Sequence, residues 1–251
     1  MKILTSMNRR IYLDYGQDML DRVLRFMPPK METVVYWDGQ DPPRTPGERL
    51  QFRHLERVDG FLDFRTFAEK YQFDKGIHNR QNAFLWNAQR FCCKGFAWGD
   101  YLPDEDVIWL DADVKVFDHV PGSFLQGLVR SKPYTYLGRE KSYTETGFLA
   151  FNHRWPESYF LRRIILEMYR THKVFSLAAW TDCHVFDHAR SAVGGGENLS
   201  PAGKNFDHVF NGSILGRYMD HCKGPRKKKG FSPETWKSVE HRDHGVHAAS
   251  G

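Results

Sequence analysis

The chain opens with short apolar runs that are separated by a stretch of helical periodicity. Residues 2–7 and 33–38 each predict a short strand. Between them, apolar residues recur at helical spacing over 20–27, until Pro28 and Pro29 end the pattern. A strand, helix, strand order of this kind predicts an α/β fold with a mostly parallel, Rossmann-like sheet flanked by helices.

The middle of the chain continues this alternation. Over residues 81–98, apolar and aromatic positions trace one face of a helix, and Arg90 and Lys94 lie one turn apart on a neighbouring face. Further along, the same reasoning predicts strands over 134–138 and 147–152 and an amphipathic helix over 159–169. After the glycines at 194–196 the pattern thins into loops.

Residues 107–110, Val-Ile-Trp-Leu, form the clearest strand of the chain. This apolar run stops abruptly at Asp111 and Asp113, as a buried parallel strand does at the carboxyl edge of a sheet, where open α/β sheets bind their ligands. In an extended chain the two carboxylates project to the same side and can hold one divalent cation, for which Mn²⁺ or Mg²⁺ suits oxygen ligands best. Such a cation would stabilise the charge on a departing diphosphate. The alternative is a solvated strand end or a turn.

A second group of candidate ligands lies near the end of the chain, over residues 220–229. His221 can complete a metal site, Gly224 allows close approach of the backbone to a phosphate, and Lys227 belongs to a run of cations that suits a diphosphate. The alternative is a solvated basic tail that binds no ligand.

Length and composition indicate one catalytic domain. With 251 residues, of which 41% are hydrophobic, the chain is long enough for one substantial core. We expect a single domain over 1–234 and a weakly ordered tail over 235–251. The four cysteines have neither the spacing of a zinc site nor that of a disulfide framework, so we expect reduced packing residues.

No stretch approaches the roughly 20 apolar residues that cross a bilayer, and the first ten residues lack the apolar run of a signal peptide. We therefore expect a soluble, cytoplasmic protein. The formal charge of +5 favours anionic partners such as nucleotide phosphates, nucleic acid or an acidic membrane surface, without separating them.

Three segments, taken in order, carry a resemblance to a known family. They are residues 108–113 (Ile-Trp-Leu-Asp-Ala-Asp), residues 145–152 (Glu-Thr-Gly-Phe-Leu-Ala-Phe-Asn) and residues 221–227. Together they resemble the ordered motifs of GT-A fold glycosyltransferases, especially the glycogenin-like retaining group. The resemblance implies transfer of a hexose from a nucleoside-diphosphate sugar, such as a UDP-sugar. It also implies manganese held by Asp111, Asp113 and His221, with Gly224 and Lys227 on the donor phosphates.

The resemblance also suggests residues at the reacting carbon. Related enzymes carry a paired polar motif where this chain has Thr181, Asp182 and Cys183, and Asp182 is the matching carboxylate. The family often has Asn-Ala-Gly where this chain has Glu-Thr-Gly, beginning at Glu145. Glu145 and Asp182 can orient or deprotonate an attacking hydroxyl or stabilise an oxocarbenium-like centre, and the alternative is a strand-end cap or a surface carboxylate.

The donor nucleotide would lie beyond the first two strands, where this fold binds base and ribose. Arg90 and Lys94 can face the diphosphate from the helix before the aspartates, or form a solvent-facing pair of cations. Position along the chain assigns the remaining donor contacts to Ser6, Asn8, Arg9, Tyr12 and Asp38.

The acceptor is open to more than one interpretation. Residues 91–97, the aspartate strand and residues 145–148 are similar to kinetoplastid and phage enzymes that glucosylate hydroxymethylated DNA bases, which implies a DNA acceptor with its base turned out of the stack. A cytoplasmic glycan or glycolipid precursor is the nearest alternative. A nucleic-acid-binding module without catalysis, and a metal-dependent nuclease or phosphatase, are alternatives of other classes.

Overall fold

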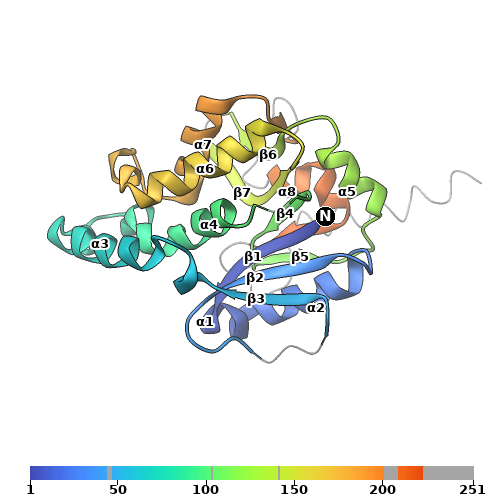
Figure 1. Cartoon of the computed structure of the whole chain (residues 1–251), viewed down its shortest axis with the longest axis horizontal. Coiled ribbons are helices and arrows are strands. Elements are labelled where there is room, and N and C mark those ends of the chain that lie inside the picture. Colours follow the sequence, from blue (N-terminus) through green and yellow to red (C-terminus); the bar gives the residue numbers. More distant parts are fainter. Residues whose placement is uncertain (44–46, 103, 141, 201–208, 223–251) are drawn as a thin grey trace, which may run out of the picture.

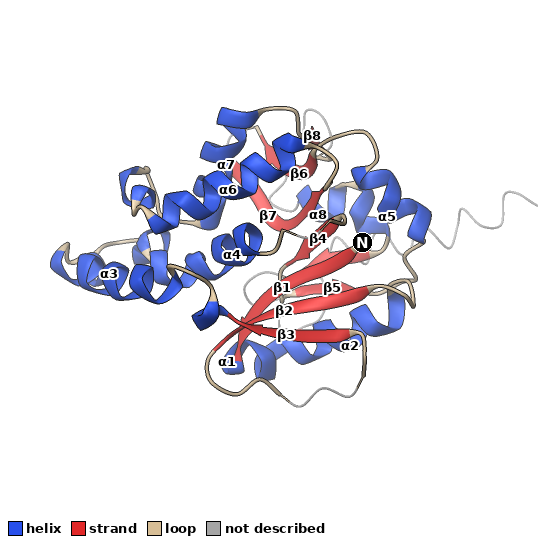
Figure 2. Ribbon diagram, in the orientation of Figure 1, coloured by secondary structure: helices blue, strands red, loops and turns tan. Residues whose placement is uncertain are grey.

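The computed structural model describes residues 1–43, 47–102, 104–140, 142–200 and 209–222. Its centre is a seven-stranded sheet in the order β3-β2-β1-β4-β7-β6-β8, with helices on both faces (Figures 1 and 2). The strands are β1 (Lys2–Asn8), β2 (Glu32–Asp38), β3 (Leu50–His54), β4 (Val107–Leu110), β6 (Tyr134–Arg139), β7 (Ser142–Phe151) and β8 (Glu197–Asn198).

Most neighbours in this sheet run parallel. Strand β1 pairs in parallel with β2 and β4, β2 pairs with β3, and β6 pairs with β8, whereas β7 is antiparallel to both β4 and β6. A separate antiparallel pair joins β5 (Val114–Val116) to β9 (Met219–His221). The predicted mostly parallel α/β architecture is confirmed.

The helices complete two outer layers. They are α1 (Arg9–Ile11), a π-helical turn (Tyr12–Gly16), α2 (Gln17–Phe26), α3 (Phe61–Asp74), α4 (Ala88–Asp100), α5 (Gly122–Val129), α6 (Pro156–Arg170), α7 (Asp182–Val193) and α8 (Val209–Gly212). Single 3₁₀ turns span Leu55–Arg57, Ile77–Asn79, Ala83–Trp86, Lys173–Ser176 and Ile214–Arg217. None of the helices in these described ranges is long and apolar enough to cross a membrane.

The unbroken apolar run of β4 follows from its position between two cores. Val107 and Trp109 pack into the core beneath α3, α4, α6 and α7, whereas Ile108 and Leu110 pack into the core beneath α2, α5 and α8. Because helices cover both faces of the sheet, neither set of alternating side chains meets water, and all four residues are buried.

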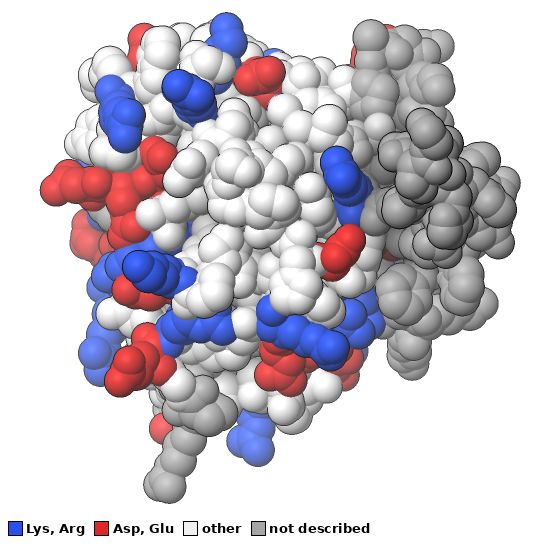
Figure 3. Space-filling view, turned by 90° about the vertical axis from the view of Figure 1, so that its right-hand side faces the viewer, with Lys and Arg blue, Asp and Glu red and all other residues white. Residues whose placement is uncertain are grey.

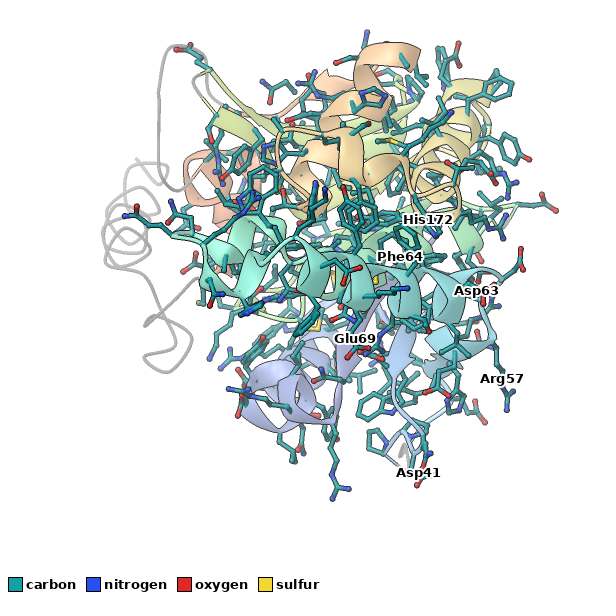
Figure 4. The ribbon with its side chains drawn as sticks, turned by 90° about the vertical axis from the view of Figure 1, so that its left-hand side faces the viewer. Asp41, Arg57, Asp63, Phe64, Glu69 and His172 are labelled. Carbon is teal, nitrogen blue, oxygen red and sulfur yellow. The ribbon has the colours of Figure 1, made fainter. Side chains whose placement is uncertain are left out.

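Helix α3 lies along the outside of the first of these cores. Its Phe64 is fully buried and lies beside His172, with ring centroids 6.0 Å apart (Figure 4). Two further rings close over this position, because Phe67 stacks on His172 with centroids 3.9 Å apart and Phe175 stacks on Phe64 at 5.8 Å. This aromatic packing fixes α3 against the segment that follows α6.

The helix before β4 is shorter than the sequence predicts. Instead of one helix over 81–98, the chain forms a 3₁₀ turn and then begins α4 at Ala88. Two asparagines cause the break: Asn82 adopts a left-handed conformation with φ of 64°, and the Asn87 side chain accepts the backbone N–H of Arg90 as the cap of α4. The last described residues also form short elements where loops were predicted.

Helices α4 and α6 pack with their backbones unusually close. A Cβ placed on Gly95 would lie 2.0 Å from a ring carbon of Tyr169, and one placed on Gly99 would lie 2.4 Å from Cβ of Leu166. No side chain larger than hydrogen fits at either position without moving α6. These two glycines therefore set the distance between the helices over the sheet.

We predict that Gly95→Ala lowers the free energy of unfolding by about 1–3 kcal/mol, because the added methyl group overlaps the Tyr169 ring. The matched control is Gly127→Ala in α5, where an added Cβ meets nothing within 4 Å. There the substitution should stabilise the helix by roughly 0.5–1 kcal/mol. Urea denaturation of both variants measures the difference, and equal effects on the two would contradict the packing argument.

Candidate metal centre

Two aspartates at the end of β4 and one histidine on β9 come together at the carboxyl edge of the sheet. Asp111, Asp113 and His221 each offer a ligand atom, and these atoms lie within 4.8 Å of one another. Nε2 of His221 is 2.9 Å from Oδ1 of Asp113 and 3.7 Å from Oδ2 of Asp111. Two carboxylates and one imidazole form a donor set that binds a divalent cation.

The two aspartates converge because the chain turns between them. The prediction that they share one side of an extended chain was wrong in detail, since the backbone N–H of Val114 donates to the carbonyl of Asp111 at 3.0 Å and closes a turn. The turn begins immediately after β4, where the N–H of Asp111 donates to the carbonyl of Gly147 on β7. The pair is thus anchored to the sheet at its first residue.

Strand pairing brings His221 to the aspartates across a long stretch of sequence. In the second sheet His221 lies opposite Val114, and the N–H of Cys222 donates to the carbonyl of Asp113 at 3.1 Å. A glycine makes room for the ring, because a Cβ at position 147 would lie 2.3 Å from Nδ1 of His221. The imidazole is 5% exposed and has little freedom to turn away.

Glu145 stands behind the histidine. Its Oε1 lies 3.1 Å from Nδ1 of His221 and accepts the backbone N–H of Gly147 at 3.0 Å, and its other oxygen pairs with Arg139. A carboxylate on the far nitrogen of a ligand histidine fixes the orientation of its ring. Because Glu145 faces Nδ1 while Asp113 faces Nε2, the imidazole of His221 lies between Glu145 and the aspartates.

Lys94 joins the cluster to Asp182. Its Nζ lies 2.7 Å from Oδ2 of Asp111 and 2.6 Å from Oδ2 of Asp182, and Asp182 also accepts the Thr146 hydroxyl at 2.5 Å. The second oxygen of Asp111 accepts the indole N–H of Trp109 at 2.7 Å. The ammonium group of Lys94 thereby links Asp182 to the candidate metal ligands, although Asp182 lies 71 positions after Asp111 in the sequence.

Charge pairing dominates the electrostatics of this group. Burial lowers the pKa of His221, but Asp113 and Glu145 outweigh it and raise the pKa to about 9. Burial likewise opposes the charge on Lys94, but Asp111 and Asp182 hold its pKa well above the usual range. Burial raises the pKa of Asp111 in spite of both neighbouring cations. The carboxylates of this group are therefore paired with two cationic side chains, His221 and Lys94.

Two of the predicted donor contacts, Asn8 and Asp38, end β1 and β2 on the same edge of the sheet. Asn8 faces Asp38 across these strands and caps α1 by accepting the N–H of Ile11. Asp38 pairs with Arg65, and the ring of Tyr12 meets Trp37 edge-on at 6.1 Å. The remaining predicted contacts are Ser6, which is half-buried on β1, and Arg9 and Arg90, which are exposed.

Two predicted ligands, Gly224 and Lys227, lie outside the described residues, as does the predicted tail over 235–251. None of the four cysteines forms a disulfide in the part of the chain that the structure describes, and Cys92 and Cys222 are buried. Sequence reasoning missed Trp109, Arg139 and Thr146 as neighbours of the cluster. Of these, Trp109 and Thr146 had a signal in the sequence, because they lie within the segments 108–113 and 145–152 that carry the resemblance, whereas Arg139 had none.

Comparison with solved structures places this geometry in a known fold. The chain aligns with a galactosyltransferase, LgtC, in complex with donor and acceptor sugar analogues, with a TM-score of 0.56, 16% identity, and coverage of 95% of this chain and 99% of that one. An active-site mutant of LgtC gives a TM-score of 0.52 at 15% identity, covering 90% of this chain and 88% of that one. The chain has the GT-A fold. The predicted resemblance is confirmed at this level.

A third GT-A structure is the apo form of mouse xyloside xylosyltransferase 1, with a TM-score of 0.50 and 10% identity over 80% of this chain and 86% of that one. No family model and no curated protein matches the sequence. The GT-A fold is therefore recognised here through the arrangement of its elements and not through overall sequence similarity.

We predict that Mn²⁺ raises the melting temperature of this protein and that Asp113→Asn abolishes the rise. A ligand that binds only the folded state stabilises it by mass action, and the substitution removes one charged ligand oxygen. Asp21→Asn, at an exposed position on α2, is the matched control and should keep the full shift. Thermal unfolding with and without Mn²⁺ checks this, and an unchanged shift in Asp113→Asn would contradict the proposed ligand set.

A second prediction concerns Glu145. Replacing it with glutamine should weaken Mn²⁺ binding by about 10-fold, because loss of the carboxylate behind a ligand histidine typically costs 10–100-fold in affinity. Titration calorimetry measures the change, with Glu197→Gln on the exposed strand β8 as the control. Undiminished affinity in Glu145→Gln would show that this carboxylate does not position His221.

Proposed function

We propose that this protein is a metal-dependent glycosyltransferase that transfers a hexose from a nucleoside-diphosphate sugar, in particular a UDP-sugar, to a hydroxyl acceptor. The observation that carries the proposal is the cluster of Asp111, Asp113 and His221 at the carboxyl edge of β4 in a GT-A fold. Sugar transfer is further supported by the similar structures, which are a galactosyltransferase with sugar analogues and a xylosyltransferase.

The reaction exchanges one bond at the anomeric carbon for another. The acceptor oxygen bonds to that carbon, and the bond to the diphosphate oxygen breaks. The departing nucleoside diphosphate keeps the electron pair and accepts the proton that the acceptor hydroxyl loses. A divalent cation on Asp111, Asp113 and His221, Mn²⁺ or Mg²⁺, would neutralise the charge that develops on the diphosphate. Gly224 and Lys227 are proposed as further phosphate contacts on the basis of the sequence alone.

Asp182 and Lys94 are the groups best placed to act beside the cation. Lys94 carries its positive charge between Asp111 and Asp182, so it holds the second carboxylate next to the metal ligands. In this arrangement Asp182 stabilises positive charge at the anomeric carbon, in keeping with a retaining reaction. The contacts of Glu145 favour a role in orienting His221 over the acceptor-binding role that the sequence suggested.

The nucleotide would extend from the cation along the edge of the sheet toward β1 and β2. Asn8 and Asp38 lie opposite each other at the ends of these strands, and Ser6, Arg9 and Tyr12 lie close by in sequence. In the proposal this part of the site binds the base and the ribose. Arg90, one helical turn before Lys94 on α4, is proposed to face the diphosphate.

The acceptor remains a prediction from the sequence, with a hydroxymethylated DNA base as the first candidate and a glycan or glycolipid precursor as the second. The net charge of +5 suits an anionic acceptor of either kind and does not separate the two. A nucleic-acid-binding module without catalysis would not need the metal cluster, so the same experiment separates all three.

Purified protein is incubated with Mn²⁺ or Mg²⁺ and a panel of nucleotide sugars, in the presence of hydroxymethylated DNA, of small saccharides or of no acceptor, and should release nucleoside diphosphate. Asp113→Ala should reduce the release by at least about 100-fold while the far-ultraviolet circular dichroism stays unchanged, because only the charge stabilisation at the leaving group is lost. Asp21→Ala is the control.

Release that occurs only with DNA supports the first acceptor, and release with small saccharides supports the second. A protein that binds DNA but releases no nucleotide from any donor with either metal ion would overturn the proposed activity.

A further inference from the structure

The segment between α3 and the middle of α4 combines cations with aromatic rings. From Lys75 to Gly99 the sequence contains Lys75, Arg80, Arg90 and Lys94 but no aspartate or glutamate. The flanking carboxylates, Asp74 and Asp100, stand just outside it. By contrast, the face drawn in Figure 3, on the side of the molecule away from α3, shows Lys and Arg interspersed with Asp and Glu.

Phe84 is the exposed aromatic ring of this segment, whereas Trp86 and Phe91 are half-buried. Phe84 is 53% exposed and meets Phe91 edge to face, with centroids 5.0 Å apart. The guanidinium of Arg90 lies 4.9 Å from the centre of the Phe84 ring, and that of Arg80 lies 5.6 Å from the ring of Trp86. Each arginine is exposed, so its charge remains available to a ligand above the rings.

Two connections link this segment to the residues of the candidate metal centre. Arg90 lies one turn before Lys94 on α4, and Lys94 contacts both Asp111 and Asp182. On the other side, the carbonyl of Leu85 accepts the N–H of Trp180 at 2.9 Å, and Trp180 lies two residues before Asp182. The rings of Trp86 and Trp180 meet edge to face at 5.2 Å.

We infer that residues 75–91 form the acceptor-binding surface and that the acceptor is nucleic acid presented as a single strand or as an opened stretch of duplex. This inference rests on the proposed sugar transfer. Phe84 stacks on a base, while Arg80 and Arg90 contact neighbouring phosphates, which is how sequence-independent single-strand binding combines stacking with charge. A neutral glycan would use the ring of Phe84 but would form no ion pair with Arg80 or Arg90.

The test measures binding separately from turnover, with the full chain and a fluorescein-labelled single-stranded DNA of about 16 nucleotides. Phe84→Ala should weaken binding by about 10-fold or more, because one base–aromatic stack is lost. Arg80→Ala and Arg90→Ala should each lower the slope of log affinity against log salt by about 0.7, and Arg90→Lys should restore it.

Matched controls lie elsewhere on the surface. Phe160→Ala removes a ring that is 56% exposed on α6, and Arg25→Ala removes a guanidinium that lies 5.0 Å from the Phe26 ring on α2. Neither should change DNA binding. Inorganic polyphosphate serves as a polyanion without bases, and Phe84→Ala should bind it as tightly as the unchanged protein does.

The outcomes separate this inference from the proposed function. Equal DNA affinity in Phe84→Ala and Phe160→Ala, or an equal loss for DNA and polyphosphate, would overturn the stacking surface while Mn²⁺-dependent nucleotide release stayed intact. If nucleotide release fails in the unchanged protein but Phe84→Ala still weakens DNA binding selectively, the surface stands and the proposed activity falls.

Discussion

The candidate centre depends on cations that neutralise the negative charge of several carboxylates, which lie close together with little access to water. Asp111, Asp113, Glu145 and Asp182 would repel one another if each remained charged and unpaired in such a place. Three cationic side chains lie between them. Lys94 pairs with Asp111 and Asp182, Arg139 pairs with Glu145, and His221 contacts Asp113 and Glu145. The surrounding fold therefore has to deliver side chains from distant parts of the sequence to one edge of the sheet.

The glycines show how closely the backbone must approach for this to happen. Gly147 leaves space for the His221 ring, and Gly95, one residue after Lys94, lets α4 lie against Tyr169 of α6. Gly147 likewise follows Glu145 by two residues, so both glycines lie close in sequence to members of the charged group. Packing in the core and positioning of the charges are thus achieved by the same short segments.

The sequence predicted β1, β2, β4, β6, part of β7 and the two aspartates of the site because those signals are local, whereas it missed the edge strands β3 and β8. The apolar run before Asp111 revealed both a buried strand and the two carboxylates at its end. His221 was identified from its place before a basic segment, but no local pattern could show that β9 would pair with β5. The contacts of Lys94 with Asp182, and of Glu145 with His221, depend on long-range packing that periodicity does not report. Asn82 and Asn87 ended the expected helix because turn and cap preferences outweighed an apolar pattern that continued through them.

The pairing of β5 with β9 also has a consequence for how the protein matures. His221 lies on the last described strand, 108 positions after Asp113 in the sequence. A nascent chain on the ribosome contains the aspartates long before it contains the imidazole, so it cannot capture an ion with the complete ligand set until synthesis has passed this strand. A chain that ended before β9 would have all seven strands of the main sheet but only two of the three candidate ligands.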